Sequence, residues 1–332
     1  MLKKLMLAAS ALALMTGAAS AQFSERTIRV SNGVTSDHPI GNGLTKMTAC
    51  LAEKSGGKMK LQSFWGGALG GDLQAATALR SGTQEMVVTS TSPLVGMLPE
   101  LGVFDLPFLF ANEKEADAIL DGPFGKHIAD KLPAIGLINL SYWENGFRNL
   151  TNSKKPVDKL EDFPGLKVRV MQNNIFLDTF KTLGANAVPM AFQEVFAALE
   201  TRAIDGQENP FVTISNMKLW EVQKYLSITN HAYTPFLILY SKALFDKLSA
   251  EEQKALFDCA AVGQAEQRKV TREQGASALA NVKKEGMQVN ELNADQQKRL
   301  REAVKPVYER TSATVGKETV DRIQAELAKI RG

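Results

Sequence analysis

The stretch GLKVRVMQNNIFLDTFKTLGANAVPMAFQEVFAALE, residues 165–200, alternates a short β-rich segment with longer helical patterns. Its mainly apolar run from Lys167 to Met171 is typical of a buried strand. The apolar spacing that follows predicts one helix from Ile175 to Leu183 and another from Phe192 to Thr201. Alternating strands and helices imply parallel sheets with helices on both faces, which is an α/β fold.

The same alternation extends through the N-terminal part of the chain. Further strands are predicted at residues 28–31, 59–64, 86–89 and 137–142. Helices are predicted at residues 73–79 and through Leu44, Met47 and Leu51, where Gly56-Gly57 ends the helix.

A long helical pattern follows Ser249, which forms the capping-box sequence S-x-x-E with Glu252. The pattern ends at Gly286, and its apolar positions recur at Ala255, Cys259, Val262 and Val270. Such a helix is longer than one small domain requires, so we expect it to run across two domains.

The length and charge of the chain limit its class. At 332 residues it exceeds the usual size of a single core, which favours two domains. No Pro/Gly/Ser-rich linker separates them, so we expect the chain to cross between the domains at a hinge. The formal net charge of +3 includes Lys3 and Lys4, and acidic and basic residues are interspersed elsewhere. Nucleic-acid binders usually carry a basic excess, so nucleic acid is not an expected partner.

The first 21 residues have the order of a secretory signal peptide. Lys3 and Lys4 precede the apolar run from Leu5 to Met15, and Ala19-Ser20-Ala21 is a small-x-small cleavage site. The alternative is an ordinary buried first helix. The order predicts cleavage after Ala21, a mature chain starting at Gln22 and a periplasmic location, since no later stretch is long and apolar enough to span a membrane.

The two cysteines, Cys50 and Cys259, each lie in an apolar helical pattern. They can act as two small buried hydrophobic residues, or they can form one disulfide between distant segments, because export places them where disulfides persist. The sequence leaves both possibilities open.

Catalytic and cofactor motifs are absent from the sequence. His38, His127 and His231 lack metal-ligand spacing, and there is no G-x-S-x-G nucleophile elbow. The glycine-rich run at residues 66–71 lacks the first glycine of a dinucleotide fingerprint, because Trp65 stands there. We therefore expect a protein that is not an enzyme and that carries no metal or cofactor.

Polar residues within strand-like segments are the remaining candidates for function. Arg169 is central in an apolar segment, Arg148 follows Gly146-Phe147, and Asn209 lies in DGQENP at residues 205–210. A buried arginine is costly unless it is paired, and its planar fork suits a carboxylate. That carboxylate belongs either to an internal acidic residue or to a ligand bound at the carboxyl ends of strands.

Residues 165–225 resemble the DctP-like solute-binding proteins of tripartite ATP-independent periplasmic (TRAP) transporters. The resemblance rests on GLKVRV (165–170), LGA (183–185), PMAF (189–192), EVFAAL (194–199), DGQENP (205–210) and EVQKY (221–225). A looser resemblance covers nearly the whole mature chain, including Leu69-Gly70, Leu106-Pro107-Phe108 and Asn230-His231.

The resemblance implies a two-domain periplasmic binding-protein fold with hinge-crossing strands and a long helix that spans both domains. Domain I is expected at residues 22–145 plus 235–274, and domain II at 146–234 plus 275–332. The cleft between them closes on a small organic monocarboxylate, which a monomeric receptor delivers to the membrane subunits of a TRAP permease for uptake driven by an ion gradient.

The resemblance also implies roles for individual residues. Arg169 pairs with the ligand carboxylate, assisted by Arg148 and Asn209, while further positions line the cavity: Asn32, Ser90, Gln172 and Phe192. Glu208 and His231 are implied to hold the arginine, with Glu208 paired to Arg169 and His231 to Glu208.

The residues of the expected cavity favour one class of acid. The sialic-acid branch of the family carries charged residues at the positions of Ser90 and Pro93, so a sialic-acid ligand is not expected here. The hydroxyls of residues 89–92 suit a smaller hydroxylated acid, or they only cap a helix. We predict a sugar acid such as a uronate or aldonate; the alternatives are an aliphatic or aromatic keto acid, an exported two-domain enzyme and a receptor that only signals.

Overall fold

The computed structural model describes residues 23–332, so the predicted signal peptide and its cleavage site lie outside the described residues. The strands are β1 (Arg26–Asn32), β2 (Met59–Phe64), β3 (Met86–Ser90), β4 (Leu137–Asn152), β5 (Lys167–Val170), β6 (Asn186–Pro189), β7 (Gly206–Asn209), β8 (Tyr225–Ser241) and β9 (Gln288–Glu291). They form one sheet in the order β2-β1-β3-β8-β4-β7-β5-β6, with β9 paired to β8.

The α-helices are α1 (Pro39–Ser55), α2 (Asp72–Arg80), α3 (Glu113–Leu120), α4 (Pro123–Ala129), α5 (Asn174–Thr182), α6 (Val195–Glu200), α7 (Phe211–Asn216), α8 (Lys242–Phe245), α9 (Ala250–Lys284), α10 (Ala294–Ala303), α11 (Lys305–Val315) and α12 (Lys317–Arg331). Short 3-10 helices include η1 (Ser92–Leu94), η2 (Pro99–Asp105) and η5 (Phe192–Glu194).

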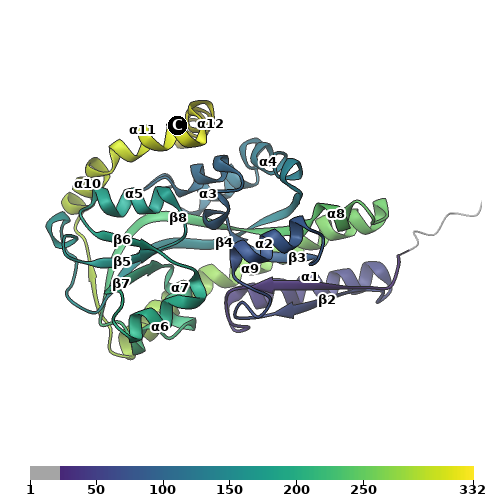
Figure 1. The fold of residues 1–332 in the computed structure, drawn as a ribbon, viewed down its shortest axis with the longest axis horizontal. Coiled ribbons are helices and arrows are strands. Elements are labelled where there is room, and N and C mark those ends of the chain that lie inside the picture. The colour runs from purple at the N-terminus through teal and green to yellow at the C-terminus, as the bar shows by residue number, and fades with distance from the viewer. Residues whose placement is uncertain (1–22) are drawn as a thin grey trace, which may run out of the picture.

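Two long strands join the two ends of the molecule (Figure 1). β4 and β8 have 16 and 17 residues and pair with each other in antiparallel fashion over most of their length. The C-terminal part of β8 pairs with β3, whereas its N-terminal part pairs with β9. We call β1–β3 with α1–α4, η1, η2 and the loops between them the first half, and β5–β7 with α5–α7 and the loops between them the second half. β4 and β8 are therefore the strands that cross between the halves.

The sheet is mixed, so the prediction of parallel sheets was only partly right. β1, β2 and β3 pair in parallel, as do β5, β6 and β7, but every pair between β4 or β8 and the strands β3 and β7 is antiparallel. The predicted strand at 137–142 is also far longer than expected. A register shift between Glu144 and Gly146 interrupts the alternation of side chains there, which hides the continuation from a search for period-2 patterns.

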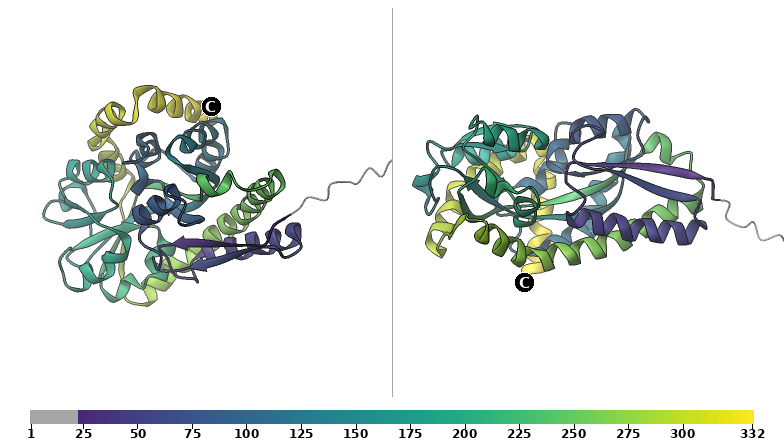
Figure 2. Two further views of the ribbon diagram at one scale, coloured as in Figure 1. Left: turned by 45° about the vertical axis from the view of Figure 1, so that its right-hand side comes forward. Right: turned by 90° about the horizontal axis from the view of Figure 1, so that it is seen from below.

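Helices cover both faces of the sheet, as predicted. In β8, Ile238 and Tyr240 pack in a core with α1 and α9, whereas Leu237 and Leu239 pack in a second core with α2. This is the period-2 alternation of a strand that is buried on both sides. The views in Figure 2 show α1 and α9 side by side along one face of the first half.

The long helix α9 begins at the predicted capping box. The Glu252 N–H donates to Ser249 Oγ (3.2 Å), and the Ser249 N–H donates to a Glu252 carboxylate oxygen (2.9 Å). α9 packs against α1 in the first half and against α7 in the second half, so it spans both. The prediction that Val262 lies on its apolar face was wrong, because Val262 is 45% exposed. The buried stripe instead continues from Cys259 to Gly263 and Gln267 at helical spacing.

The two cysteines form a disulfide, which decides between the two possibilities left by the sequence. Cys50 of α1 and Cys259 of α9 are joined with a Cα–Cα distance of 5.5 Å and a sequence separation of 209 residues. The bridge fixes the N-terminal helix of the first half to the long spanning helix.

The last two helices also contact both halves. Tyr308 of α11 donates its hydroxyl to the Pro107 carbonyl (2.8 Å), and Arg331 of α12 forms an ion pair with Glu115 of α3 (2.7 Å). α11 packs in addition on α5 of the second half. These contacts cross the expected division at residues 145 and 275, and the exact domain boundaries stay a prediction.

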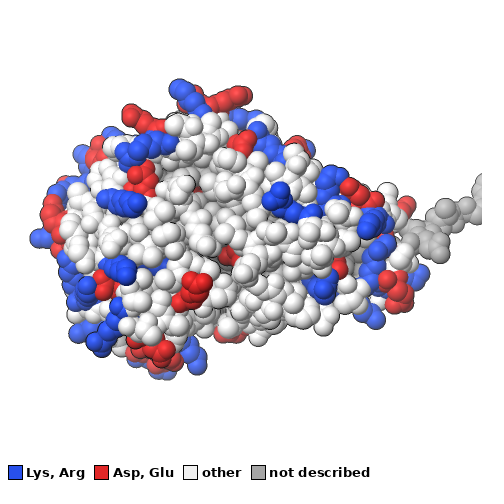
Figure 3. Space-filling view, in the orientation of Figure 1, with Lys and Arg blue, Asp and Glu red and all other residues white. Residues whose placement is uncertain are grey.

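Charged side chains of both signs are interspersed around the edge of the molecule, whereas the part of this face around α2 carries few of them (Figure 3). Within residues 23–332, no helix is long and apolar enough to cross a membrane.

Candidate ligand-binding site

A small cavity of about 40 Å³ lies between the two halves, beside the crossing strand β4. It is bounded on several sides by apolar residues, with a few polar side chains among them. Its lining residues are Gly33, Val34, Ile40, Asp72, Val88, Ser90, Asn145, Arg148, Arg169, Met171, Phe192, Asn209, Thr213 and Phe236. Five of the seven predicted ligand contacts are therefore on its wall: Arg169, Arg148, Asn209, Phe192 and Ser90.

Arg169 lines the cavity with a guanidinium that is only partly satisfied. It is 2% exposed, and its Nε and Nη2 donate to the Met190 carbonyl at 2.9 and 2.7 Å. Its Nη1 is buried and has no hydrogen-bond partner within residues 23–332. Burial lowers the pKa of Arg169 to about 10, which reflects the cost of holding its charge away from water. A buried cation with an unused N–H suits an anionic ligand.

Arg148 of β4 is fully buried and held much more completely. Its Nε and Nη2 donate to the two carboxylate oxygens of Glu208 at 2.5 and 2.9 Å. Nη2 also donates to the Glu208 carbonyl and to Asn209 Oδ1, and Nη1 donates to Thr234 Oγ1. Arg148 therefore has an internal counter-ion, unlike Arg169.

The prediction that Glu208 pairs with Arg169 was wrong, because Glu208 pairs with Arg148. Both carboxylate oxygens of Glu208 accept hydrogen bonds from Arg148, whereas Arg169 donates to the Met190 carbonyl. β4 also shifts its register between Arg148 and Leu150, so the side on which Arg148 lies does not follow from simple alternation along the strand. The implied group of three is therefore Arg148, Glu208 and His231.

His231 completes this buried group. Its Nε2 is 3.0 Å from a Glu208 carboxylate oxygen, and its Nδ1 is 2.8 Å from Thr229 Oγ1. The rings of Phe176 and Phe180 approach the imidazole edge-on. Burial tends to raise the pKa of Glu208, but the charge of Arg148 and the hydrogen bond from His231 outweigh it and leave the pKa below its usual value.

Two predicted contacts are not on the cavity wall. Asn32 is buried, but its side-chain amide donates to the Phe64 carbonyl at the end of β2 and accepts from the Val34 N–H. Gln172 is exposed and lines an adjoining pocket of about 420 Å³ instead. Their neighbours in sequence, Gly33 and Met171, line the cavity in their place.

Residues 89–92 do not act as a helix cap. Thr91 precedes η1 and makes no side-chain capping bond. Ser90 lies on the cavity wall, and its hydroxyl is 3.5 Å from that of Ser92. Ser92 in turn donates to Asp105 (2.5 Å), whose other oxygen accepts from Asn173 (2.7 Å). Burial raises the pKa of Asp105 to about 7, in a polar network behind the cavity.

Asp72 is a lining residue that the sequence analysis missed. It is the first residue of α2 and lines both the cavity and the adjoining pocket. Burial raises its pKa, while the Thr89 hydroxyl and the charge of Arg169 act in the opposite direction. An acidic residue at a helix N-terminus is common, so the sequence carried no signal for a place in a cavity. Asn145 and Thr213 also line the cavity and were also missed, because nothing in the sequence around them indicates such a place.

The site contains no grouping of side chains suited to a metal. Within residues 23–332, no three His, Cys, Asp or Glu side chains are placed to hold an ion. The arrangement combines one under-satisfied cation, one carboxylate and several neutral polar groups around a small apolar cavity. Such a set can bind an anion and hydrogen-bond to its substituents.

Comparison with known proteins agrees with this chemistry. The family model for the bacterial extracellular solute-binding protein family 7 matches residues 30–314. The sugar acid binding protein of Advenella mimigardefordensis, solved with galactonate, is 48% identical with a TM-score of 0.90 over 92% of this chain and 99% of that one. A TRAP periplasmic solute-binding protein of Polaromonas sp. JS666, bound to D-erythronate, is 38% identical with a TM-score of 0.87 over 91% and 99%.

A further relative is also named for an acid that it binds. The 2,3-diketo-L-gulonate-binding periplasmic protein YiaO of Escherichia coli K12 is 39% identical over 244 residues, which are 74% of each chain. The predicted two-domain binding-protein fold with its long spanning helix is confirmed by these structural matches. This is a family of transport receptors rather than of enzymes. The chain belongs to the bacterial extracellular solute-binding protein family 7, the family of TRAP transporter receptors.

Proposed function

We propose that this chain captures a small hydroxylated monocarboxylate, of the uronate or aldonate class, by closure of the cleft between its halves. It then presents the bound acid to the membrane subunits of a TRAP permease. The proposal rests on the chemistry of the cavity and on relatives that bind galactonate, D-erythronate and 2,3-diketo-L-gulonate.

Arg169 is the observation that carries the proposal. Its charge is buried, yet among residues 23–332 its guanidinium donates only to the Met190 carbonyl and its Nη1 has no partner. A ligand carboxylate supplies the missing counter-ion in the geometry that a guanidinium prefers. Arg148 is already paired with Glu208, so it contributes by positioning Asn209 and by its positive field.

Asp72 accounts for the preference for hydroxyl groups. A carboxylate on the cavity wall accepts hydrogen bonds from ligand hydroxyls, and Ser90, Asn145, Asn209 and Thr213 add neutral donors and acceptors. A second carboxylate on the ligand would instead meet the charge of Asp72 at close range. The site therefore favours one carboxylate at Arg169 and hydroxyls toward Asp72.

A keto acid is the second candidate. The ring of Phe192 lies 5.9 Å from the guanidinium carbon of Arg169 and packs against the cores of both halves. A flat, apolar carbon skeleton could stack there. The polar residues of the lining, above all Asp72, would then be left without partners, which makes the keto acid the weaker candidate.

We further propose that residues 1–21 direct export, that the mature chain begins at Gln22 and that it acts as a monomer in the periplasm. The order of Lys3-Lys4, the apolar run and Ala19-Ser20-Ala21 supports export. Intact-mass analysis of the exported protein should give a chain that starts at Gln22, and a product that retains Met1 would contradict it.

A thermal-shift screen against an organic-acid library tests the proposed ligand class. A ligand that binds only the folded state at 100 times its Kd stabilises it by about 2.7 kcal/mol. Uronates and aldonates should raise Tm, whereas succinate and aliphatic keto acids should not. In Asp72→Asn, which lacks the negative charge, dicarboxylates should begin to raise Tm. Sugar acids should raise Tm less than they do in the wild type. A wild-type screen in which only dicarboxylates or keto acids raise Tm would overturn the proposal.

A further inference from the structure

A second hollow lies across β4 from the ligand cavity. This groove has a volume of about 710 Å³, against about 40 Å³ for the cavity. Residues 144–147 of β4 line it, together with Pro210, Phe211 and Val212 at the start of α7. On the other side, the adjacent residues Arg148, Asn209 and Thr213 line the cavity, and Asn145 borders both spaces. The cavity and the groove are thus separated by the same short segments of chain.

One wall of the groove belongs to α3 and α9. Arg272 of α9 forms ion pairs with Asp117 of α3 (2.8 Å) and with Glu144 of β4 (2.6 Å). One turn earlier, Arg268 binds Asp121 and the Tyr142 carbonyl. These contacts tie α9 and α3 to the part of β4 that pairs with β8 beside the first half.

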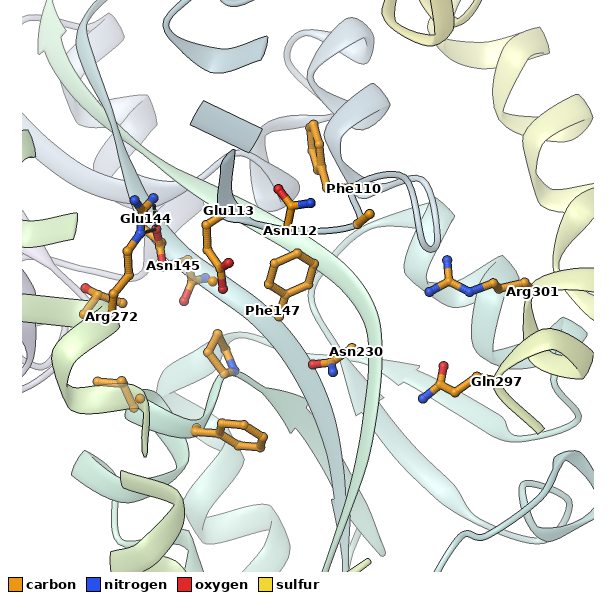
Figure 4. Close-up of a pocket in the computed structure, with 17 residues that line it drawn as sticks. Phe110, Asn112, Glu113, Glu144, Asn145, Phe147, Asn230, Arg272, Gln297 and Arg301 are labelled. Atoms are coloured by element: carbon orange, nitrogen blue, oxygen red, sulfur yellow. Dashed lines mark hydrogen bonds and ion pairs between the residues drawn. The ribbon is translucent and has the colours of Figure 1, made fainter. Parts of the chain in front are cut away.

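The opposite wall belongs to α10. Gln297 of α10 donates weakly to the carbonyls of Ile228 and Thr229 in the part of β8 that lies beside β9. Figure 4 shows Glu144 and Arg272 on one side of the groove and Gln297 and Arg301 on the other. The two walls are therefore fixed to different stretches of the crossing strands, one beside the first half and the other near β9.

The crossing strands have the irregular backbone expected of a hinge at this place. β4 shifts its register between Glu144 and Gly146, and Gly146 has a φ of 114°. On β8, Asn230 adopts a φ of 43° and also lines the groove. A rotation of the halves about these points moves the walls of both spaces. Because the two spaces lie on opposite sides of the hinge, a rotation that narrows the cavity must widen the groove.

We propose that the groove is a control point for closure: bulk seated in it excludes the open state and so tightens ligand binding at the cavity. Opening of the cleft requires the groove to narrow. Bulk in the groove therefore raises the free energy of the open state relative to the closed state. The effect is a shift in population between two states, with no new contact to the ligand. Only the affinity readout of this proposal rests on the proposed function.

Gly275 of α9 offers a way to fill the groove. It lines the groove, and a Cβ added there would have no atom within 4 Å. Gly275→Trp therefore adds an indole to the groove wall, and Gly275 itself does not line the cavity. Gly275→Ala is the matched control for the gain in helix propensity, and Gly96→Trp places the same side chain at an exposed glycine outside both spaces. Gly275→Leu serves as a smaller wedge if the indole prevents folding.

Small-angle scattering without ligand and dissociation kinetics with D-galactonate test the proposal. Gly275→Trp should be more compact than wild type when free, and its ligand should dissociate more slowly. Affinity should rise roughly tenfold or more if the closed state is a minor population in the free protein. Both controls should behave as wild type.

The proposal would be overturned if Gly275→Trp and Gly275→Leu had the same scattering and the same ligand dissociation rate as the wild type. It would also be overturned if these variants were more open than the wild type in the absence of ligand. If galactonate binds no variant and not the wild type either, the proposed ligand class is at fault. The scattering of the free proteins then still decides the role of the groove.

Discussion

Arg169 and Arg148 are both buried arginines, yet their N–H groups are satisfied to different degrees. Arg148 donates to Glu208, Asn209 and Thr234, whereas in the described part of the chain Arg169 donates to one backbone carbonyl and its Nη1 has no partner. The sequence predicted that both would be buried near each other. It did not predict which would take the internal carboxylate, because that depends on the register between β4, β5 and β7.

The first prediction at this scale concerns Arg169→Ala. Removing the guanidinium leaves the ligand carboxylate desolvated without its partner, a loss of roughly 2–5 kcal/mol, or about 30-fold to several thousand-fold in Kd. Arg169→Lys should also bind poorly, because an ammonium lacks the planar fork. Calorimetric titration with galactonate measures both, and Arg299→Ala, an exposed arginine paired with Glu161, is the control. Near-native affinity of Arg169→Ala would refute its role.

Glu208→Gln should behave differently, because Glu208 is the counter-ion of Arg148 and lines no cavity. Breaking one partner of a fully buried ion pair leaves an uncompensated charge, which costs roughly 3–5 kcal/mol of folding free energy. Urea unfolding of the free protein should show this loss, and ligand affinity should fall as Asn209 and Arg148 lose their fixed positions. Glu161→Gln, in an exposed pair, should change little. An unchanged unfolding midpoint in Glu208→Gln would contradict the pairing.

The lining residues show where sequence reasoning about the site reached its limit. Arg169, Asn209 and Phe192 lie in a segment whose motifs are specific, and the structure brings them to one cavity. For Asn32 and Gln172 the prediction was wrong by one residue each, because their neighbours Gly33 and Met171 line the cavity instead. In a strand or tight loop, a shift of one residue turns the side chain to the opposite side. Such a shift cannot be found without the fold.

Among the elements, α1, β2 and α9 were predicted closely because their signals are local. Gly56 ends α1 in a left-handed conformation, and Ser249 with Glu252 begins α9. Only the first part of β4 was predicted, and β8 was not predicted at all. Their pairing joins residues about 90 positions apart, such as Trp143 and Phe236, and a bulge at the hinge breaks their alternation. Local patterns carry no trace of such distant partners.

The disulfide between α1 and α9 gives a prediction at the element scale. It closes a loop of 209 residues, so in the chain-entropy model it stabilises the fold by about 5 kcal/mol. The double variant Cys50→Ala/Cys259→Ala should lose stability of this order in urea. It should keep its ligand affinity, since neither cysteine lines the cavity. Two free thiols in the exported wild-type protein would rule out the bridge.

At the scale of the whole molecule, one continuous sheet joins the two halves, and three further features connect them: α9, α11 and the polar network of Ser92, Asp105 and Asn173. The cavity of about 40 Å³ has room for about three water molecules, far less than a six-carbon acid needs. If the ligand is a sugar acid, as proposed, the halves must move apart to admit it and close again around it. Capture and closure are two aspects of one rotation about β4 and β8.

The most direct test of the account is a pair of calorimetric titrations of the wild-type protein, one with D-galactonate and one with hexanoate. Both acids have six carbons and one carboxylate, so each can pair with Arg169. Hexanoate, however, leaves Asp72 and the neutral polar groups without partners. Two such buried groups at about 1 kcal/mol each make hexanoate at least about 30-fold weaker. We predict tight, saturable binding of galactonate and much weaker binding of hexanoate. Equal affinity for the two acids would contradict recognition of a hydroxylated acid and would favour an apolar ligand instead.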